Sequence, residues 1–271
     1  MNFDPTTLAI PIFAIAIGIE FAYDFIKKAN EYEITDTFTN IALGAVSIFW
    51  GALFVYFYSY IFDWFYSISP IRLPNVWWVW VVALILDDFF YYWYHRFSHE
   101  SRFLWNFHVV HHSSEHYNLS VALRQSWFSN SVNWIFYLPM ALLGFPLSIR
   151  AAAHGFNLIY QFFIHTKFVP KLGNLEYFLN TPSHHRVHHG VNNPYLDKNY
   201  AGIFILWDRL FGTFVEEDEL PRYGIIKPIK SFNWLWINTH AWAEMWEAMK
   251  SRQTLFGKLR CIFGSPNMDF K

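Results

Sequence analysis

The sequence predicts an all-α integral membrane protein, with four to five transmembrane helices and a histidine-rich helical cap on the cytosolic side. Of its 271 residues, 54% are hydrophobic and only 15% are charged, whereas a soluble domain carries about 25% charged residues. Two uncharged segments are longer than the roughly 20 apolar residues that cross a bilayer. Twelve of the thirteen histidines lie between residues 95 and 189, which places the polar chemistry in one part of a single domain.

Five segments are candidates for the spans: 5–25, 37–62, 74–94, 125–149 and 151–166. The second and fourth contain no charged residue, while the first and third are each interrupted by two acidic residues. A Gly-Phe-Pro turn at 144–146 predicts that 127–166 folds as a helical hairpin. Five spans fit this pattern, and so do four, with 5–25 lying in the membrane interface.

The distribution of basic residues predicts the orientation. In a five-span arrangement with the N-terminus outside, Arg72 and Arg150 are the only two of twenty Lys and Arg residues on the outer side. The positive-inside rule therefore places the histidines on the cytoplasmic side, of the inner membrane in a bacterium or the endoplasmic reticulum in a eukaryote. Segment 232–260 alternates tryptophans with polar residues, as in an amphipathic interfacial helix; a surface helix packed on the domain fits as well.

Composition also excludes several classes of protein. The high hydrophobicity excludes a disordered chain, and the net charge of −1 gives no electrostatic basis for binding nucleic acid. Cys261 is the only cysteine, so a disulfide framework and a cysteine-based zinc or iron–sulfur site are excluded. Histidine is the one abundant residue left that binds transition metals.

The histidines recur at helical spacing. His95 and His99 are four residues apart, and His108, His111 and His112 stand at i, i+3 and i+4, so each set shares one helix face. The same pattern returns in the set His185, His188 and His189. One metal takes four to six ligands, so eight to ten histidines indicate two metals. Imidazole suits Zn, Cu, Fe and Ni, and since zinc has no redox chemistry, we predict two irons that activate O2.

These boxes read HRFSH at 95–99, HVVHH at 108–112 and HRVHH at 185–189. With them the sequence resembles the membrane fatty-acid hydroxylase/sterol desaturase family over residues 85–215. The resemblance implies a non-haem di-iron centre, O2 as oxidant and a lipid substrate. The iron ligands that it implies are His95, His99, His108, His111, His112, His185, His188 and His189.

Four further residues are candidates around this centre. His165 matches a family histidine between the second and third boxes, which implies another ligand. His184 begins a doubled HHxxHH form and is either a ligand or a residue that positions one. Asp88 lies two helical turns before His95, where it would accept the free N–H of a ligand imidazole. Glu100 matches a family glutamate, which implies a role in binding metal, placing a proton or positioning a reductant.

The resemblance extends beyond the boxes, over 107–126 and 197–214, and there it implies hydroxylation next to the oxygen of an alkylglycerol-type ether lipid. Such a lipid would break into an aldehyde and a glycerol derivative, with tetrahydrobiopterin as reductant. The sequence contains no dinucleotide-binding fingerprint, so electrons come from a pterin or from an electron-donor protein. Two alternatives stay open: a fatty-acyl or sterol hydroxylase or desaturase on the same irons, and a histidine-rich membrane transporter of metal or haem.

Overall fold

The computed structural model describes residues 5–266, and this part of the chain is built from helices without a strand. Its long helices are α1 (Pro5–Lys27), α2 (Ile34–Ile68), α3 (Trp77–Glu100), α6 (Leu147–Ile164) and α9 (Trp234–Lys250). The shorter ones are α4 (Arg102–His112), α5 (Leu138–Leu142), α7 (Pro182–His188), α8 (Leu206–Phe211) and α10 (Leu255–Phe263). Five 3-10 turns join them: η1 (Leu119–Leu123), η2 (Ser129–Ser131), η3 (Asn133–Tyr137), η4 (Gly173–Tyr177) and η5 (Asn193–Tyr195).

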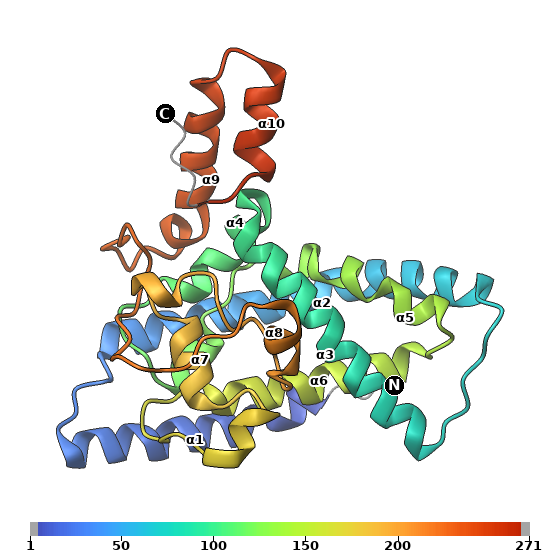
Figure 1. Ribbon diagram of the computed structural model, residues 1–271, viewed down its shortest axis with the longest axis horizontal. Coiled ribbons are helices and arrows are strands. Elements are labelled where there is room, and N and C mark those ends of the chain that lie inside the picture. The colour runs from blue at the N-terminus through green and yellow to red at the C-terminus, as the bar shows by residue number, and fades with distance from the viewer. Residues whose placement is uncertain (1–4, 267–271) are drawn as a thin grey trace.

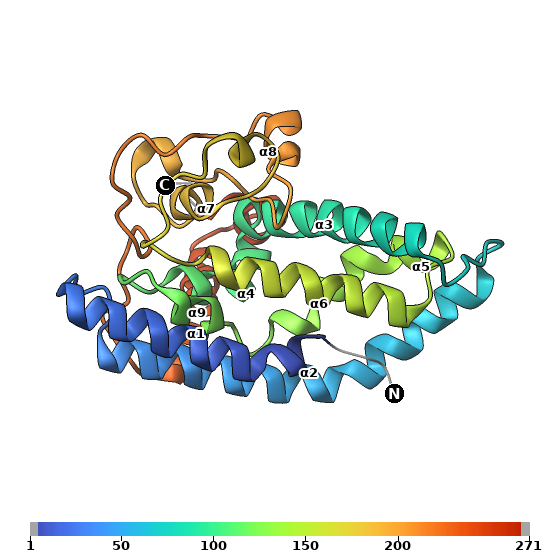
Figure 2. The ribbon, with the colours of Figure 1, turned by 90° about the horizontal axis from the view of Figure 1, so that it is seen from below.

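Helices α1, α2, α3 and α6 lie side by side along the long axis of the molecule, and the segment that contains α7 and α8 covers one end of them (Figures 1 and 2). Helix α6 packs between α1 and α3. The α9–α10 hairpin projects from the same end, across the direction of the bundle, and packs on α4 (Figure 1). The bundle end and its cap therefore enclose the histidines.

Two helices, α1 and α2, are long and apolar enough to cross a membrane. Only 17% of the apolar window of α1 and 22% of that of α2 is buried inside the protein. Exposed side chains such as Ile15 on α1 and Phe49 on α2 therefore form an unusually apolar surface. The all-α prediction is confirmed for the described residues. Of the four to five predicted spans, α1 and α2 are the two described helices whose length and composition suffice to cross a membrane.

The prediction of one continuous span over 125–149 is wrong. Residues 129–137 form the 3-10 turns η2 and η3, and α5 is only five residues long. The polar run from Ser126 to Asn133 is the cause, because its side chains hydrogen-bond nearby backbone: the Ser129 hydroxyl donates to Ser126 O at 3.0 Å. The expected hairpin over 127–166 is consequently an irregular segment followed by one helix, α6.

The turn before α6 needs its glycine. Gly144 has a φ of 85°, and a Cβ there would lie 2.6 Å from the carbonyl oxygen of Ile71. The same close approach lets Leu73 N donate to Gly144 O at 3.0 Å, which ties the α2–α3 connection to this turn. The far end of the bundle is thereby closed, opposite the end that carries the histidines.

Candidate metal centre

Nine histidines meet at the capped end of the bundle. Helix α3 supplies His95 and His99 in its last two turns, and the extended backbone of Ser101 then turns the chain into α4. The remaining seven come from α4, from the residue after α6, and from α7 with the residue after it. They form a five-histidine group, His95, His99, His108, His112 and His188, and a four-histidine group, His111, His165, His185 and His189.

The nitrogen atoms within each group have the spacing of ligands around one ion. In the five-histidine group, Nε2 of His108 lies 2.9 Å from Nε2 of His95 and 3.0 Å from Nε2 of His112. In the four-histidine group, Nε2 of His165 lies 3.2 Å from Nε2 of His111 and 2.9 Å from Nε2 of His185. A zinc–imidazole bond is about 2.1 Å, so nitrogens at adjacent coordination positions lie roughly 3 Å apart. Each group fits one transition-metal ion.

Two buried nitrogens reinforce this fit. Nε2 of His99 and Nε2 of His189 have no hydrogen-bond partner among the described residues. A buried polar atom without a partner costs free energy unless something else binds it. A metal ion in each group would satisfy both atoms, and the all-nitrogen donor set suits iron as well as zinc, copper and nickel.

Backbone carbonyls orient four of these nine imidazoles. Nδ1 of His95 donates to Tyr200 O at 2.7 Å, and Nδ1 of His188 donates to Lys198 O at 2.9 Å. The corresponding partners in the four-histidine group are Arg124 O for His111 (3.2 Å) and Gln161 O for His165 (2.6 Å). A carbonyl accepts only, so it holds the proton on Nδ1 and leaves the Nε2 lone pair free for a metal.

The electrostatics of the site favour neutral imidazoles. Burial, reinforced by neighbouring histidines, holds the pKa of His108, His112 and His188 well below the usual value. The same causes lower the pKa of His111. Neutral imidazole is the form that binds a metal, so the cap prepares these side chains for coordination.

Asp88 does not accept from a ligand imidazole, contrary to the prediction. Its carboxylate accepts from the backbone N–H groups of Ile203 (2.6 Å) and Phe204 (2.9 Å) and from Nε1 of Trp207 (2.9 Å). These bonds attach the cap loop to α3, and the same loop carries the Tyr200 carbonyl that holds His95. Asp88 therefore acts on the centre through the position of the cap.

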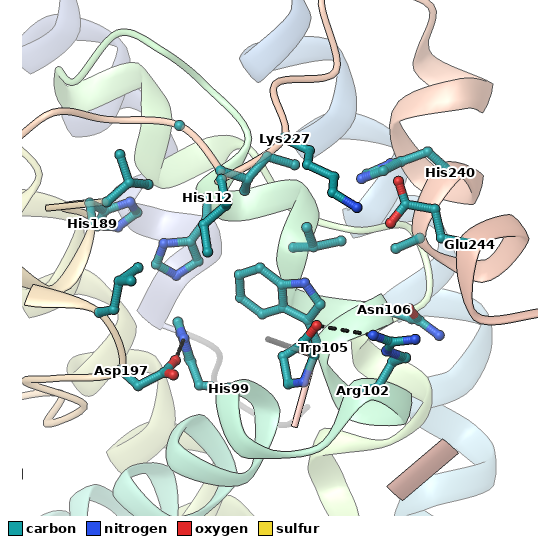
Figure 3. A pocket seen from close by; sticks show the side chains of 18 of the residues that line it. His99, Arg102, Trp105, Asn106, His112, His189, Asp197, Lys227, His240 and Glu244 are labelled. Carbon is teal, nitrogen blue, oxygen red and sulfur yellow. Dashed lines mark hydrogen bonds and ion pairs between the residues drawn. The ribbon is translucent and has the colours of Figure 1, made fainter. Parts of the chain in front are cut away.

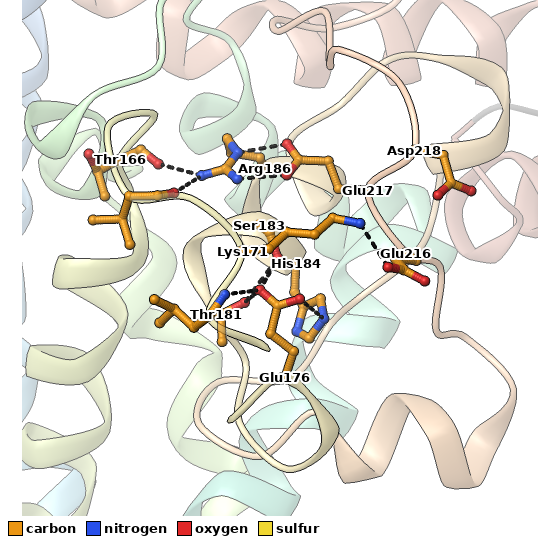
Figure 4. Close-up of polar contacts among 12 residues, drawn as sticks. Thr166, Lys171, Glu176, Thr181, Ser183, His184, Arg186, Glu216, Glu217 and Asp218 are labelled. Atoms are coloured by element: carbon orange, nitrogen blue, oxygen red, sulfur yellow. Dashed lines mark hydrogen bonds and ion pairs between the residues drawn. The ribbon is translucent and has the colours of Figure 1, made fainter. Parts of the chain in front are cut away.

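Glu100 and His184 also lie outside both groups. The Glu100 carboxylate accepts from Nε of Arg96 at 2.8 Å on the protein surface. His184 belongs to neither group; its ring lies beside Glu176, with Nε2 3.9 Å from Oε2 of that residue (Figure 4). Burial lowers the pKa of His184 to about 4, although Glu176 opposes this shift. The structure thus brings nine of the ten predicted histidine ligands together, and His184 is the exception.

Sequence reasoning missed Arg124, which supports the four-histidine group. Its backbone carbonyl orients His111, while its guanidinium donates to Asn40 Oδ1 at 2.8 Å and lies 3.3 Å from Asp36 Oδ1. Arg124 is buried, so the start of α2 is tied to a ligand of the centre. One feature of the sequence could have pointed to Arg124: it is the only Lys, Arg, Asp or Glu between Glu115 and Arg150.

A cavity of about 270 Å³ opens beside the centre. Three members of the five-histidine group, His99, His112 and His188, line it together with His189 of the four-histidine group. Figure 3 shows histidines on one side of this cavity and polar side chains of α4 and α9 on the other. A molecule bound here would lie against both groups of histidines.

An apolar helix bundle with two groups of buried imidazoles beside a cavity defines a histidine-rich helical protein whose two groups could each hold a metal ion. The family model described as fatty acid hydroxylase matches residues 80–213, the segment that holds all nine histidines. The chain belongs to the fatty acid hydroxylase family, and the resemblance inferred from the histidine boxes is confirmed.

Curated relatives extend this match. The chain is 42% identical over 265 residues to alkylglycerol monooxygenase of Homo sapiens and 43% identical over 264 residues to that of Danio rerio, covering 95% of this chain in each case. It spans 58% of the length of each of these relatives. The ornithine lipid hydroxylase OlsE of Rhizobium tropici is 28% identical over 144 residues, which cover 49% of this chain and 41% of OlsE. No solved structure gives a significant match.

Proposed function

We propose that this chain is a di-iron monooxygenase that hydroxylates the carbon next to the oxygen of an alkylglycerol-type ether lipid. The observation that carries the proposal is the cavity lined by imidazoles of both groups, in a chain 42% identical to alkylglycerol monooxygenase of Homo sapiens. Each group would hold one iron through its Nε2 atoms. When bound, the two irons supply the redox chemistry that activates O2.

The reaction balances with an external reductant of two electrons. One oxygen atom of O2 enters the C–H bond next to the ether oxygen, and the other leaves as water after taking up two electrons and two protons. The resulting hemiacetal breaks its C–O bond, giving an aldehyde and a glycerol hydroxyl. Tetrahydrobiopterin is the reductant that we propose, with an electron-donor protein as the alternative.

The residues of the chain hold and shield the reacting carbon. The nine imidazoles are all buried, and backbone carbonyls fix the orientation of four of them. The indole of Trp105 lies between the histidines and the polar side of the cavity (Figure 3). We propose that Trp105 limits the access of water to the side on which the C–H bond would react.

We further propose that α1, α2, α3 and α6 cross the bilayer and that the centre lies at its cytoplasmic face. The 18 residues of α6 span about 27 Å at 1.5 Å per residue, close to the roughly 30 Å hydrocarbon core. The irregular segment 113–146 then returns the chain between the ends of the bundle. Arg72 and Arg150 lie at the end far from the histidines, as the positive-inside rule favours.

The α9–α10 hairpin fits the surface of this bilayer. It exposes Leu235 and Trp246 on α9 and Leu255, Phe256 and Phe263 on α10. It also projects across the direction of the bundle (Figure 1), so in this arrangement it would lie along the membrane plane. We propose that the hairpin, which contains most of the amphipathic segment 232–260, rests in the lipid headgroup region.

This position favours an ether carbon as the target. The carbon next to glycerol lies near the headgroups, whereas a mid-chain carbon lies deeper, by roughly half of one leaflet of the ~30 Å core. The test is to incubate the purified protein with labelled alkylglycerol, O2 and tetrahydrobiopterin and to measure the fatty aldehyde. His188→Ala is the control that should form none.

Three other outcomes would redirect the proposal. Hydroxylated or desaturated acyl chains or sterols without aldehyde would favour the alternative substrates on the same irons. Metal or haem uptake into vesicles without O2 consumption would favour a transporter. Aldehyde formation that needs a reductase and ignores the pterin would assign the electrons to a partner protein.

A further inference from the structure

The side of the cavity opposite the histidines contains a buried amide with an unpaired end. Asn106, on α4, is fully buried and lines the cavity. Its Nδ2 contacts the sulfur of Met245 at 3.3 Å, while its Oδ1 has no hydrogen-bond partner among the described residues. A buried acceptor without a donor lowers the stability of the folded protein unless a ligand or a water molecule donates to it. Asn106 thus presents an acceptor to whatever fills the cavity.

A second buried acceptor lies on the same side. His240, on α9, is 5% exposed and lines the cavity. Its Nδ1 donates to Ile237 O at 2.9 Å, so the proton of the neutral ring stays on Nδ1 and Nε2 carries a free lone pair. Figure 3 shows Asn106 and His240 on the side away from His99, His112 and His189.

The charges around these acceptors balance. The cations Arg102 and Lys227 and the anions Glu244 and Asp197 all line the cavity. A site for phosphate would concentrate cations, and this one does not. Two neutral acceptors within a balanced set of charges instead match a neutral group that donates two hydrogen bonds, such as two alcohol hydroxyls.

The size of the cavity fits a headgroup with a short piece of chain. Its 270 Å³ hold roughly nine groups of the size of a water molecule, at about 30 Å³ each. A glycerol ether with its first few methylenes has about this volume. With the hydroxyls at Asn106 and His240, the first chain carbon reaches toward the histidines across the cavity.

We infer that Asn106 and His240 recognise the free hydroxyls of a neutral glycerol headgroup and thereby place the neighbouring ether carbon at the metal centre. The inference rests on the proposed function and adds to it the residues that decide specificity. Both residues act through substrate binding, so their loss should raise KM far more than it lowers kcat.

The experiment uses the iron-loaded protein and two substrates, a 1-O-alkylglycerol and the same lipid with both hydroxyls methylated. The native protein should show a KM about tenfold lower for the free diol, since each lost neutral hydrogen bond costs about three- to tenfold. In Asn106→Leu and His240→Phe the KM for the diol should rise about five- to tenfold, while the KM for the methylated lipid stays within about twofold. His240→Gln, which keeps a polar group near the position of Nε2, should recover most of the difference.

Controls separate recognition from misfolding. His116→Phe makes the same exchange at a half-buried histidine that belongs to neither group and does not line the cavity, and it should behave as the native protein. Each variant must keep the native iron content and thermal unfolding temperature. If Asn106→Leu fails to fold, His240→Phe and His240→Gln carry the comparison alone.

Several results would overturn the inference: no preference of the native protein for the diol, an equal rise of KM on both lipids in the variants, or a rise only in the KM for the reductant. If the native protein converts neither lipid, the proposed function fails, and equilibrium binding of labelled alkylglycerol then decides. Binding weakened about tenfold by Asn106→Leu would sustain the recognition site, and unchanged binding would reject it.

Discussion

The two histidine groups differ in what surrounds them. Three of the five members of the five-histidine group line the cavity, against His189 alone in the four-histidine group. The first group takes its orienting carbonyls from the cap, at Lys198 and Tyr200, whereas the second takes them from Arg124, which is tied to α2, and from Gln161 on α6. The five-histidine group therefore faces the cavity and depends on the cap, while the four-histidine group lies deeper and depends on the bundle.

The largest effect should come from removing one ligand of each group. His188→Ala and His185→Ala should each lower activity at least about 100-fold, because loss of a supporting contact alone typically costs 10–100-fold. Iron should fall from about two atoms per chain toward one in both variants, measured by elemental analysis of the purified protein. An inactive His188→Ala protein with its full iron content would exclude a ligand role for that residue.

The dependence of the four-histidine group on the bundle can be broken at Arg124. Arg124→Met leaves Asp36 buried without its cation, and breaking such a pair costs about 3–5 kcal/mol. The variant keeps the backbone carbonyl that accepts from His111 but loses the side-chain contacts that hold this backbone in place. Iron affinity at the four-histidine group should therefore fall about 10–100-fold. Chemical denaturation and iron titration measure the two effects.

Lys250→Met is the control, because it removes a surface ion pair with Glu247. It should change neither the stability nor the iron affinity, and a similar loss of either quantity in both variants would refute this account.

The dependence of the five-histidine group on the cap can be broken at Asp88. Asp88→Asn replaces one accepting oxygen by an N–H group, which faces either the donor of Ile203 or the donors of Phe204 and Trp207. We expect a loss of about 2 kcal/mol of stability, seen as a lower unfolding temperature, together with faster proteolysis of the cap loop. Asp63→Asn, at an exposed position on α2, is the matched control. An unfolding temperature equal to that of the control would mean that Asp88 does not hold the cap.

The smallest effect is expected at His184. His184→Gln should leave the iron content at the native value, because the ring faces Glu176 and not either group. Stability should change by at most about 1 kcal/mol, the size of one hydrogen bond. Elemental analysis and thermal unfolding measure both quantities. Loss of one iron in this variant would return His184 to the set of ligands.

The sequence predicted the parts of the centre that local geometry determines. His95 and His99 on α3, like His108 and His112 on α4, share a helix face by spacing, so their convergence followed from the pattern alone. His165 is different: its place depends on how α6 packs, and it was found through the resemblance. His184 stands four residues before His188, so spacing alone did not exclude it as a ligand, but its ring lies beside Glu176 and outside both groups.

Two other errors have a common physical cause, which is competition for hydrogen bonds. Asp88 was expected to pair with an imidazole, but backbone N–H groups of the cap loop occupy its oxygens, and backbone carbonyls, which have no signature in the sequence, orient the imidazoles instead. In segment 125–149, hydropathy favoured a span, while serine side chains bonded the nearby backbone in place of a continuous helix. Hydropathy counts the absence of charge and does not register such local bonds.

The position of α7 along the chain has a consequence for how the protein is made. His185, His188 and His189 supply one member of the five-histidine group and half of the four-histidine group, yet they are synthesised after all four long helices of the bundle. During translation the four-histidine group is left with His111 and His165 until the ribosome has passed residue 189. If each group holds one iron, as proposed, loading of the second should be a late event in biogenesis, and a nascent chain stalled before α7 should retain at most one.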